Sequence, residues 1–206
     1  MTEAAVQHLL KADKTMAGLI KRVGACGWKP RTRRSPFEAL VQSVAYQQLN
    51  GTAAATILGR VKALYPGQRF PAPQDLLDTP DDRLRAAGLS RAKIAAIKDI
   101  AAKTLEGIVP TSRGIAKMDD ATILSQLTTI RGVGPWTVEM LLMFKLGRLD
   151  ILPSTDYGVR KGFALTYGWK ELPKPAELLE HGEVWRPYRS VAAWYLWRSL
   201  DIQVTL

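Results

Sequence analysis

Two glycines, Gly132 and Gly134, lie at the centre of the segment whose chemistry is easiest to interpret. They separate residues 127–131 from 135–140, an order that predicts a helix, a tight turn and a second helix. Backbone N–H groups that follow such a turn face outward at the positive end of a helix, which suits a phosphate oxygen. Glycine also ends helices that bind nothing, and for a bare Gly-x-Gly this simpler interpretation is favoured.

An isolated acid, Asp156, follows downstream. It comes after Ser154 and Thr155 and precedes the sequence Tyr-Gly-Val-Arg of residues 157–160. An aspartate in this setting typically caps the N-terminus of a helix, and Ser154 or Thr155 is available for the same role. Taken alone, the segment is therefore interpreted first as a helix cap.

The charge balance narrows the class of partner. The 206 residues include 29 Lys plus Arg against 19 Asp plus Glu, a formal net charge of +10. This excess predicts a polyanionic partner, first nucleic acid and second an anionic membrane surface. No stretch approaches the roughly 20 apolar residues that span a bilayer. The N-terminus lacks the apolar run of a signal peptide, so an intracellular location is expected.

The cysteine and histidine counts limit metal chemistry. Cys26 is the single cysteine, which excludes an internal disulfide, a cluster held by four cysteines and a zinc site built on several thiolates. Only His8 and His181 are present, which argues against a His-rich metal site.

Apolar residues recur at helical spacing along most of the chain, and no alternating strand pattern stands out. We therefore expect an all-α protein with short connections. The predicted helices cover residues 3–23, 36–48, a segment opened by Asn50 and ending near 65–67, a segment opened by Thr79 and ending at Gly88, 91–107 after Ser90, a segment from Asp119 or Asp120 to before Arg131, 135–147, and about 187–200.

Taken whole, residues 127–137 resemble the hairpin of the helix-hairpin-helix (HhH-GPD) DNA glycosylases. In that family the pattern is approximately leucine-proline-glycine-valine-glycine, any residue, then a side chain that faces the active site, and Arg131 here replaces the proline. Residues 152–162 are similar to the family's proline-x-x-aspartate-x-glycine-valine-arginine segment, and the distance between the two motifs matches. Two motifs in the correct order make the resemblance specific.

Further segments extend the resemblance over about residues 36–200. Residues 44–50 resemble the family's glutamine-glutamine loop. Residues 185–190, followed by Trp197, resemble the C-terminal helix of the DNA-3-methyladenine glycosylase II branch, here in a compact form without the N-terminal β domain. The resemblance implies two helical domains flanking a DNA-binding cleft. One would cover 36–147 and end in the hairpin, and 1–35 with 148–206 would form the second and carry the acid.

The family's catalytic carboxylate falls on Asp156. Cutting a base from its sugar develops positive charge on the deoxyribose. A carboxylate can stabilise that charge, or it can activate a water molecule on the face of the sugar opposite the leaving base. A lysine marks the bifunctional enzymes, and Trp136 occupies that position here, which implies hydrolysis without strand nicking. An indole face also attracts a cationic alkylated purine. The expected activity is monofunctional removal of alkylated purines, such as 3-methyladenine and 7-methylpurines, in base excision repair.

The resemblance assigns other roles as well. The expected pocket walls are Trp136, Trp197, Tyr46, Met140 and Tyr157, although core packing is the simpler interpretation for Tyr46 and Met140. The expected DNA contacts are Gln48, Leu49, Arg131, Gly132, Val133, Gly134, Trp136 and Arg160, with further phosphate contacts from Arg31, Arg33, Arg34, Arg91, Lys93 and Lys161. Gln48, with Leu49 beside it, is the expected wedge that fills the gap left by the flipped base, although Leu49 could instead be a buried anchor.

No cofactor is expected to be required. The backbone carbonyls of Thr128, Ile130 and Val133 match those that hold a monovalent cation, Na⁺ or K⁺, in the family. The expected partner is double-stranded DNA with a flipped damaged base, bound by a monomer, with no membrane involved. Two alternatives stay open: a glycosylase for oxidised or deaminated bases, and a non-catalytic protein that binds damaged DNA and would not need Asp156.

Overall fold

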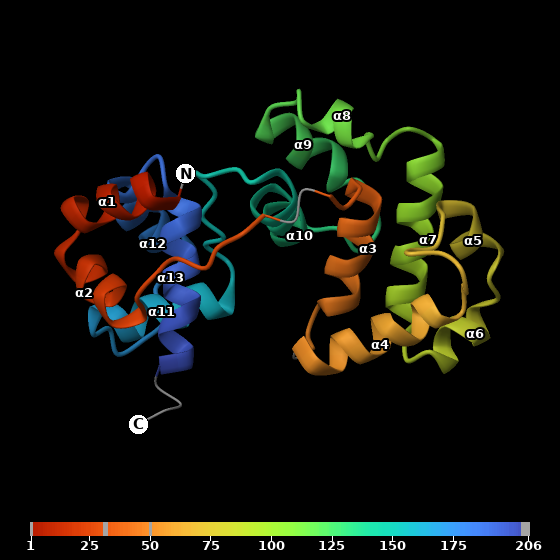
Figure 1. Cartoon of the computed structure of the whole chain (residues 1–206), viewed down its shortest axis with the longest axis horizontal. Helices are drawn as coiled ribbons and strands as arrows, with labels where there is room; N and C mark the ends of the chain where they lie inside the picture. Colours follow the sequence, from red (N-terminus) through yellow and green to blue (C-terminus); the bar gives the residue numbers. More distant parts are fainter. Residues whose placement is uncertain (1, 31–32, 50, 203–206) are drawn as a thin grey trace. The chain divides into compact units, whose positions relative to one another are not determined.

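The structure is a computed structural model that describes residues 2–30, 33–49 and 51–202 (Figure 1). Regular structure in these ranges is helical throughout, which confirms the all-α prediction. The elements are α1 (Thr2–Ala12), α2 (Lys14–Val23), α3 (Pro36–Tyr46), α4 (Gly51–Ala63), α5 (Pro73–Asp78), α6 (Asp81–Ala86), α7 (Arg91–Leu105), α8 (Ser112–Ile115), α9 (Asp120–Leu127), α10 (Pro135–Leu141), the π-helix η1 (Leu142–Leu146), α11 (Tyr157–Tyr167), α12 (Pro175–His181), the 3-10 helix η2 (Gly182–Trp185) and α13 (Arg189–Ile202). Within the described ranges, no helix combines the length and apolar character needed to cross a membrane.

The chain forms two units. Residues 31–146 make the central unit, and residues 1–30 together with 147–206 make the terminal unit. The central unit contains α3 to η1, and therefore the hairpin between α9 and α10. The terminal unit contains α1, α2 and α11 to α13, and therefore Asp156, the residue before α11.

In the central unit, α7 packs against α3 and α5, and α3 also contacts α4 and α10. The facing side chains are apolar and buried, among them Leu40 and Val44 of α3 and Ile97 of α7. Helices α3 and α7 begin at the predicted residues 36 and 91, each after a serine cap. The hydroxyl of Ser35 accepts the N–H of Glu38 at 3.1 Å, and that of Ser90 accepts the N–H of Lys93 at 3.3 Å. Local capping and apolar spacing thus fix where these helices begin and which face they bury.

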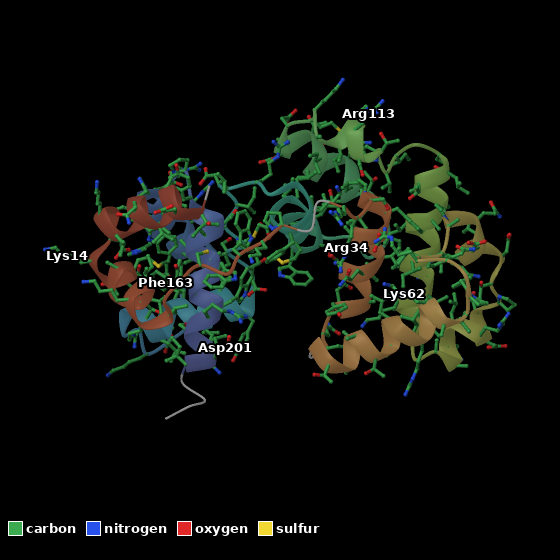
Figure 2. The ribbon with its side chains drawn as sticks, in the orientation of Figure 1. Lys14, Arg34, Lys62, Arg113, Phe163 and Asp201 are labelled. Atoms are coloured by element: carbon green, nitrogen blue, oxygen red, sulfur yellow. The ribbon has the colours of Figure 1, made fainter. Side chains whose placement is uncertain are left out.

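In the terminal unit, α13 packs against α11, α2 and α1. Helices α11 and α13 approach closely at Gly162, because a Cβ atom there would overlap the backbone carbonyl of Leu196. The ring of Phe163 lies inside this unit (Figure 2), is fully buried and stacks on Tyr167 with ring centroids 4.3 Å apart. The absence of a side chain at Gly162 therefore sets how tightly the two long helices can pack.

Asp13 organises a partly buried polar cluster in the terminal unit. One of its oxygens accepts the N–H groups of Thr15 and Met16 at 2.9 and 3.0 Å, which caps α2. The other receives three side chains: the Tyr167 hydroxyl at 2.6 Å, Trp185 Nε1 at 3.0 Å and His181 Nε2 at 3.2 Å. Burial alone would raise the pKa of Asp13, but these hydrogen bonds outweigh it and hold that pKa below its ordinary value of 3.8.

Several predicted element boundaries are wrong. The single helix predicted over 3–23 is two helices, because Asp13 ends one and caps the next. Thr79 does not open α6, since Pro80 is the cap residue and the Thr79 hydroxyl instead donates to the carbonyl of Asp75 at 2.7 Å. The helix that begins at Pro135 changes to a π-helix at Leu142 before it ends. Asn50, the predicted cap of α4, lies outside the described residues.

Candidate active site and nucleic-acid interface

The carboxylate of Asp156 is held at the N-terminus of α11 by two donors on one oxygen. Oδ1 accepts the backbone N–H of Val159 and the indole Nε1–H of Trp197, both at 2.8 Å. Asp156 is half-buried and is itself the cap residue of α11, so neither Ser154 nor Thr155 takes that role. Two donors from different helices fix the direction of the carboxylate. A carboxylate that acts on a reacting carbon needs such a fixed orientation.

Gly158 makes room for this arrangement. A Cβ atom at this position would lie 2.8 Å from Trp197 Cδ1 and 3.1 Å from Asp156 Oδ1, closer than side chains normally approach. The glycine of the aspartate motif therefore lets the indole of α13 reach over the start of α11. The hydrogen bond from Trp197 was missed by the sequence reasoning, which assigned this residue only as a pocket wall, and no local pattern links residues that stand 41 positions apart.

The other predicted site residues around α11 have different surroundings. Tyr157 is 63% exposed, so the terminal unit does not enclose it, and Lys161 Nζ lies 5.9 Å from the centre of its ring. Arg160, predicted to contact DNA, uses its Nε to donate to the carbonyl of Pro173 at 2.8 Å. Arg160 thus ties α11 to the segment that leads into α12, and Lys161 is exposed.

In the central unit, the hairpin between α9 and α10 has the predicted helix-turn-helix form. Gly132 has φ +74°, and a Cβ atom there would lie 2.7 Å from the Cβ of Ala96, so the turn needs glycine both for its conformation and for its contact with α7. Gly134 is the cap residue before α10 and has φ −93°, which is open to any residue, so a positive φ occurs only at Gly132 of the two hairpin glycines. Val133 is buried, and its N–H donates to the carbonyl of Ile130 at 3.0 Å.

Arg131 also contributes to the hairpin through its backbone. Its N–H donates to Asp99 Oδ2 of α7 at 2.7 Å, while its side chain is exposed. Proline, the residue expected here from the resemblance, has no N–H and could not make this bond. The substitution therefore adds a tether between the hairpin and α7.

The glutamine loop follows α3 in the same unit. Gln47 Nε2 donates to the carbonyl of Gly132 and to the hydroxyl of Thr137, both at 3.0 Å, so the loop is bonded to the hairpin. Gln48 is exposed and has φ +55°, a left-handed conformation that side chains rarely adopt. Leu49 is 39% exposed, so the alternative in which it is a buried anchor is wrong. The exposed pair is consistent with the predicted wedge.

Some of the cations predicted to contact phosphates are engaged within the protein, and others are exposed. Lys93 is not a simple solvated charge, because its ammonium donates to the carbonyls of Ala45 and Gln47 at 2.8 and 2.9 Å, and burial lowers its pKa. Arg34 is half-buried and lies 3.8 Å from the buried carboxylate of Glu38. The exposed cations of the predicted set are Arg33 and Arg91 in the central unit, whereas Arg31 lies outside the described residues.

The remaining predicted pocket residues also lie in the central unit. Trp136 and Met140 are one turn apart on α10 and are both half-buried, as is Tyr46 at the end of α3. The opposite side of α10 is the buried one, with Thr137, Val138 and Leu141. Among the described residues, no group of three or more His, Cys, Asp or Glu side chains could hold a metal ion.

Comparison with known proteins identifies the family. The profile of the HhH-GPD superfamily base excision DNA repair proteins matches residues 41–187, and the chain belongs to this superfamily. It is 36% identical to the DNA-3-methyladenine glycosylase 1 of Schizosaccharomyces pombe, over 97% of this chain and 87% of that protein. It is 31% identical to the alkylbase DNA glycosidase-like protein mag2 of the same organism, over 94% of this chain and 92% of that protein. A solved structure of the S. pombe 3-methyladenine DNA glycosylase in complex with abasic DNA superposes with a TM-score of 0.89, with 36% identity and 95% of each chain covered.

Proposed function

We propose that this chain is a monofunctional DNA glycosylase that hydrolyses the N-glycosidic bond of alkylated purines, such as 3-methyladenine and 7-methylpurines, in base excision repair. The observation that carries the proposal is the carboxylate of Asp156, oriented by Val159 N and Trp197 Nε1 at 2.8 Å. The similarity over nearly the whole chain to a DNA-3-methyladenine glycosylase and to an alkylbase DNA glycosidase-like protein supports the substrate class.

In the proposed reaction, Asp156 acts on the sugar of a nucleotide that has left the duplex. The C1′–nitrogen bond breaks, its electron pair leaves with the base, and positive charge develops on the deoxyribose. The carboxylate stabilises that charge while a water oxygen bonds to C1′ and gives one proton to the solvent, which yields an abasic site. Trp136 stands where an amine would be needed for a Schiff base, so the strand stays intact.

The base and the duplex are contacted by groups of the central unit. The indole of Trp136 attracts a purine made cationic by alkylation. Met140, one turn further along α10, and Tyr46, at the end of α3, add apolar contacts to the base. Gln48 and Leu49 fill the space that the base leaves in the stack. The N–H groups of Gly132 and Gly134 and the side chain of Arg131 contact phosphates, whereas the N–H groups of Arg131 and Val133 are already bonded within the protein. Arg160 adds a contact from the terminal unit through the guanidinium nitrogens beyond its Nε.

A monovalent cation, K⁺ or Na⁺, would be held by the carbonyls of Thr128, Ile130 and Val133. The donor set fits such an ion, because a carbonyl oxygen has two lone pairs and the Ile130 oxygen uses one on Val133 N–H. The ion would supply positive charge for a nearby phosphate. The protein acts as a monomer in this proposal.

Base release from methylated duplex DNA tests the proposal, with the unsubstituted protein compared with Asp156→Asn. Asparagine keeps an oxygen that can accept the N–H of Val159, so the variant preserves the helix cap and removes the charge. We expect free methylpurine from the unsubstituted protein only, with strand breaks appearing only after alkali. Breaks before alkali would refute the monofunctional assignment. Tight DNA binding without release of any methylated, deaminated or oxidised base would refute the enzyme and favour a damage-binding protein.

A further inference from the structure

Helix α7 carries a row of residues that contacts both segments proposed to bind DNA, the glutamine loop and the hairpin. Lys93, Ala96 and Asp99 stand three positions apart, so they share one face of the helix. Lys93 bonds to the end of α3, Asp99 bonds to Arg131 N, and Ala96 leaves no room for a side chain at Gly132. One face of a single helix therefore supports the glutamine loop and the hairpin together.

Lys93 caps the C-terminal end of α3 with its ammonium group. Its ammonium donates to the carbonyls of Ala45 and Gln47, at 2.8 and 2.9 Å, in the last turn of α3 and just beyond it. The last carbonyls of a helix lack partners within the helix and lie at the negative end of its dipole, so a cation is favoured there. An ammonium engaged in this way and partly withdrawn from water is poorly suited to neutralising a phosphate.

Gln47 connects this cap to the hairpin. Its carbonyl accepts from Lys93, while its side-chain Nε2 donates to Gly132 O and Thr137 Oγ1 at 3.0 Å. The next residue, Gln48, has φ +55°, a conformation that a residue with a Cβ atom does not hold without support. The polar contacts at Gln47 are adjacent to that strained residue and provide such support.

We propose that Lys93 is a positioning residue: it fixes Gln47 from the protein side so that Gln48 and Leu49 are presented to the base stack. The inference rests on the proposed function, in which this pair fills the gap left by the flipped base. Loss of the ammonium leaves the Ala45 and Gln47 carbonyls without a donor, so the loop relaxes and the flipped state is populated less. Phosphate binding is unaffected, because Lys93 makes no part of it.

The test compares Lys93→Met with Lys98→Met, a matched control. Lys98 lies on the same helix, and its ammonium pairs with Asp81 at 2.6 Å rather than with the loop. Three quantities are measured: the single-turnover rate of base release at saturating DNA, the salt dependence of DNA affinity, and the fluorescence of 2-aminopurine placed next to the lesion, which reports base flipping.

For Lys93→Met we expect the single-turnover rate and the flipping signal to fall together, by about tenfold or more, with an unchanged slope of log K against log salt. Lys98→Met keeps the rate and the signal, and Lys93→Arg, which retains a cationic donor, recovers part of both. A salt slope that falls by about 0.9, the value for one phosphate contact, with the rate unchanged would overturn the inference. A reduced rate with normal flipping, or no effect at all, would also overturn it.

Gln47→Ala keeps the assignment testable if Lys93→Met does not fold. This variant retains the carbonyl that Lys93 binds but removes the bonds to the hairpin, so the same combined loss of rate and flipping is expected. If the unsubstituted protein releases no base, the proposed function fails. The assignment of Lys93 is then decided by the flipping signal and the salt slope, where a signal equal in both proteins or a reduced slope refutes it.

Discussion

Replacement of Trp197 by phenylalanine isolates the contribution of one hydrogen bond to the carboxylate. The change keeps an aromatic ring on α13 but removes the Nε1–H that lies 2.8 Å from Asp156 Oδ1. The N–H of Val159 remains as the second donor, so the cap of α11 is retained. What the variant loses is the constraint from the second helix, and with it the fixed direction of the carboxylate.

The size of the effect follows from the kind of bond. A hydrogen bond to a charged group contributes about 1.5–3 kcal/mol. Asp156 is half-buried, so water can replace part of the lost interaction, and the lower end applies. Because about 1.4 kcal/mol corresponds to a factor of ten in rate, we expect the single-turnover rate of base release to fall about tenfold.

The assay is single-turnover release of methylpurine at saturating DNA, with thermal unfolding and DNA affinity measured alongside. Trp194→Phe is the matched control on the same helix, since the Trp194 indole packs against the ring of Tyr195 and lies 5.8 Å from the Arg198 guanidinium. Its rate should not change. Full activity in Trp197→Phe, combined with an inactive Asp156→Asn, would show that the indole does not orient the carboxylate.

Three further variants test other parts of the argument. Gly158→Ala places a Cβ 2.8 Å from Trp197 Cδ1, so base release should fall at least as far as in Trp197→Phe while DNA affinity is kept; an unchanged rate would contradict the required close approach. Gly162→Ala overlaps the Leu196 carbonyl, and overpacking against backbone should cost about 3 kcal/mol of unfolding free energy, measured in urea. Asp13→Asn tests how stability depends on pH. Because the folded-state pKa of Asp13 is lowered below 3.8, the charged carboxylate contributes fully to the free energy of unfolding above pH 3.8, and this contribution is lost as pH falls through the folded-state pKa. The variant should therefore be less stable than the parent at pH 7, with a difference that shrinks towards pH 3, whereas a constant difference would refute the role of the charge.

Contacts local in sequence were readable from the residues alone. Ser35, Ser90 and Asp119 each cap the helix predicted to follow, because a cap involves only the next three residues. The break at Asp13 was missed since apolar residues keep helical spacing across it, and the cluster that stabilises the break brings in side chains from α11 to η2. Periodicity reports which face is buried and does not report an interruption that tertiary contacts select.

In the candidate site too, the features local in sequence were predicted and the contacts between distant residues were not. The hairpin and the aspartate motif were located by their residue order, since each is a continuous segment. The bonds that orient Asp156 and the glutamine loop, from Trp197 to Asp156 and from Lys93 to Gln47, join residues more than 40 positions apart. A lysine in an amphipathic helix has the same sequence pattern whether its ammonium binds a phosphate or a carbonyl, so the sequence could not show that Lys93 donates to the carbonyls of Ala45 and Gln47.

The two interpretations of Asp156, a helix cap and a catalytic carboxylate, turn out to be compatible, and two substitutions separate them. Asp156→Ala removes the acceptor for Val159 N and should cost about 1 kcal/mol of unfolding free energy, as the loss of a helix cap usually does. Asp156→Asn keeps an acceptor and should cost less, while both variants lose base release because both lack the charge. Equal stability of the two variants would show that the cap contributes nothing. Base release retained by Asp156→Asn would show that the cap, and not the charge, is the function of this residue.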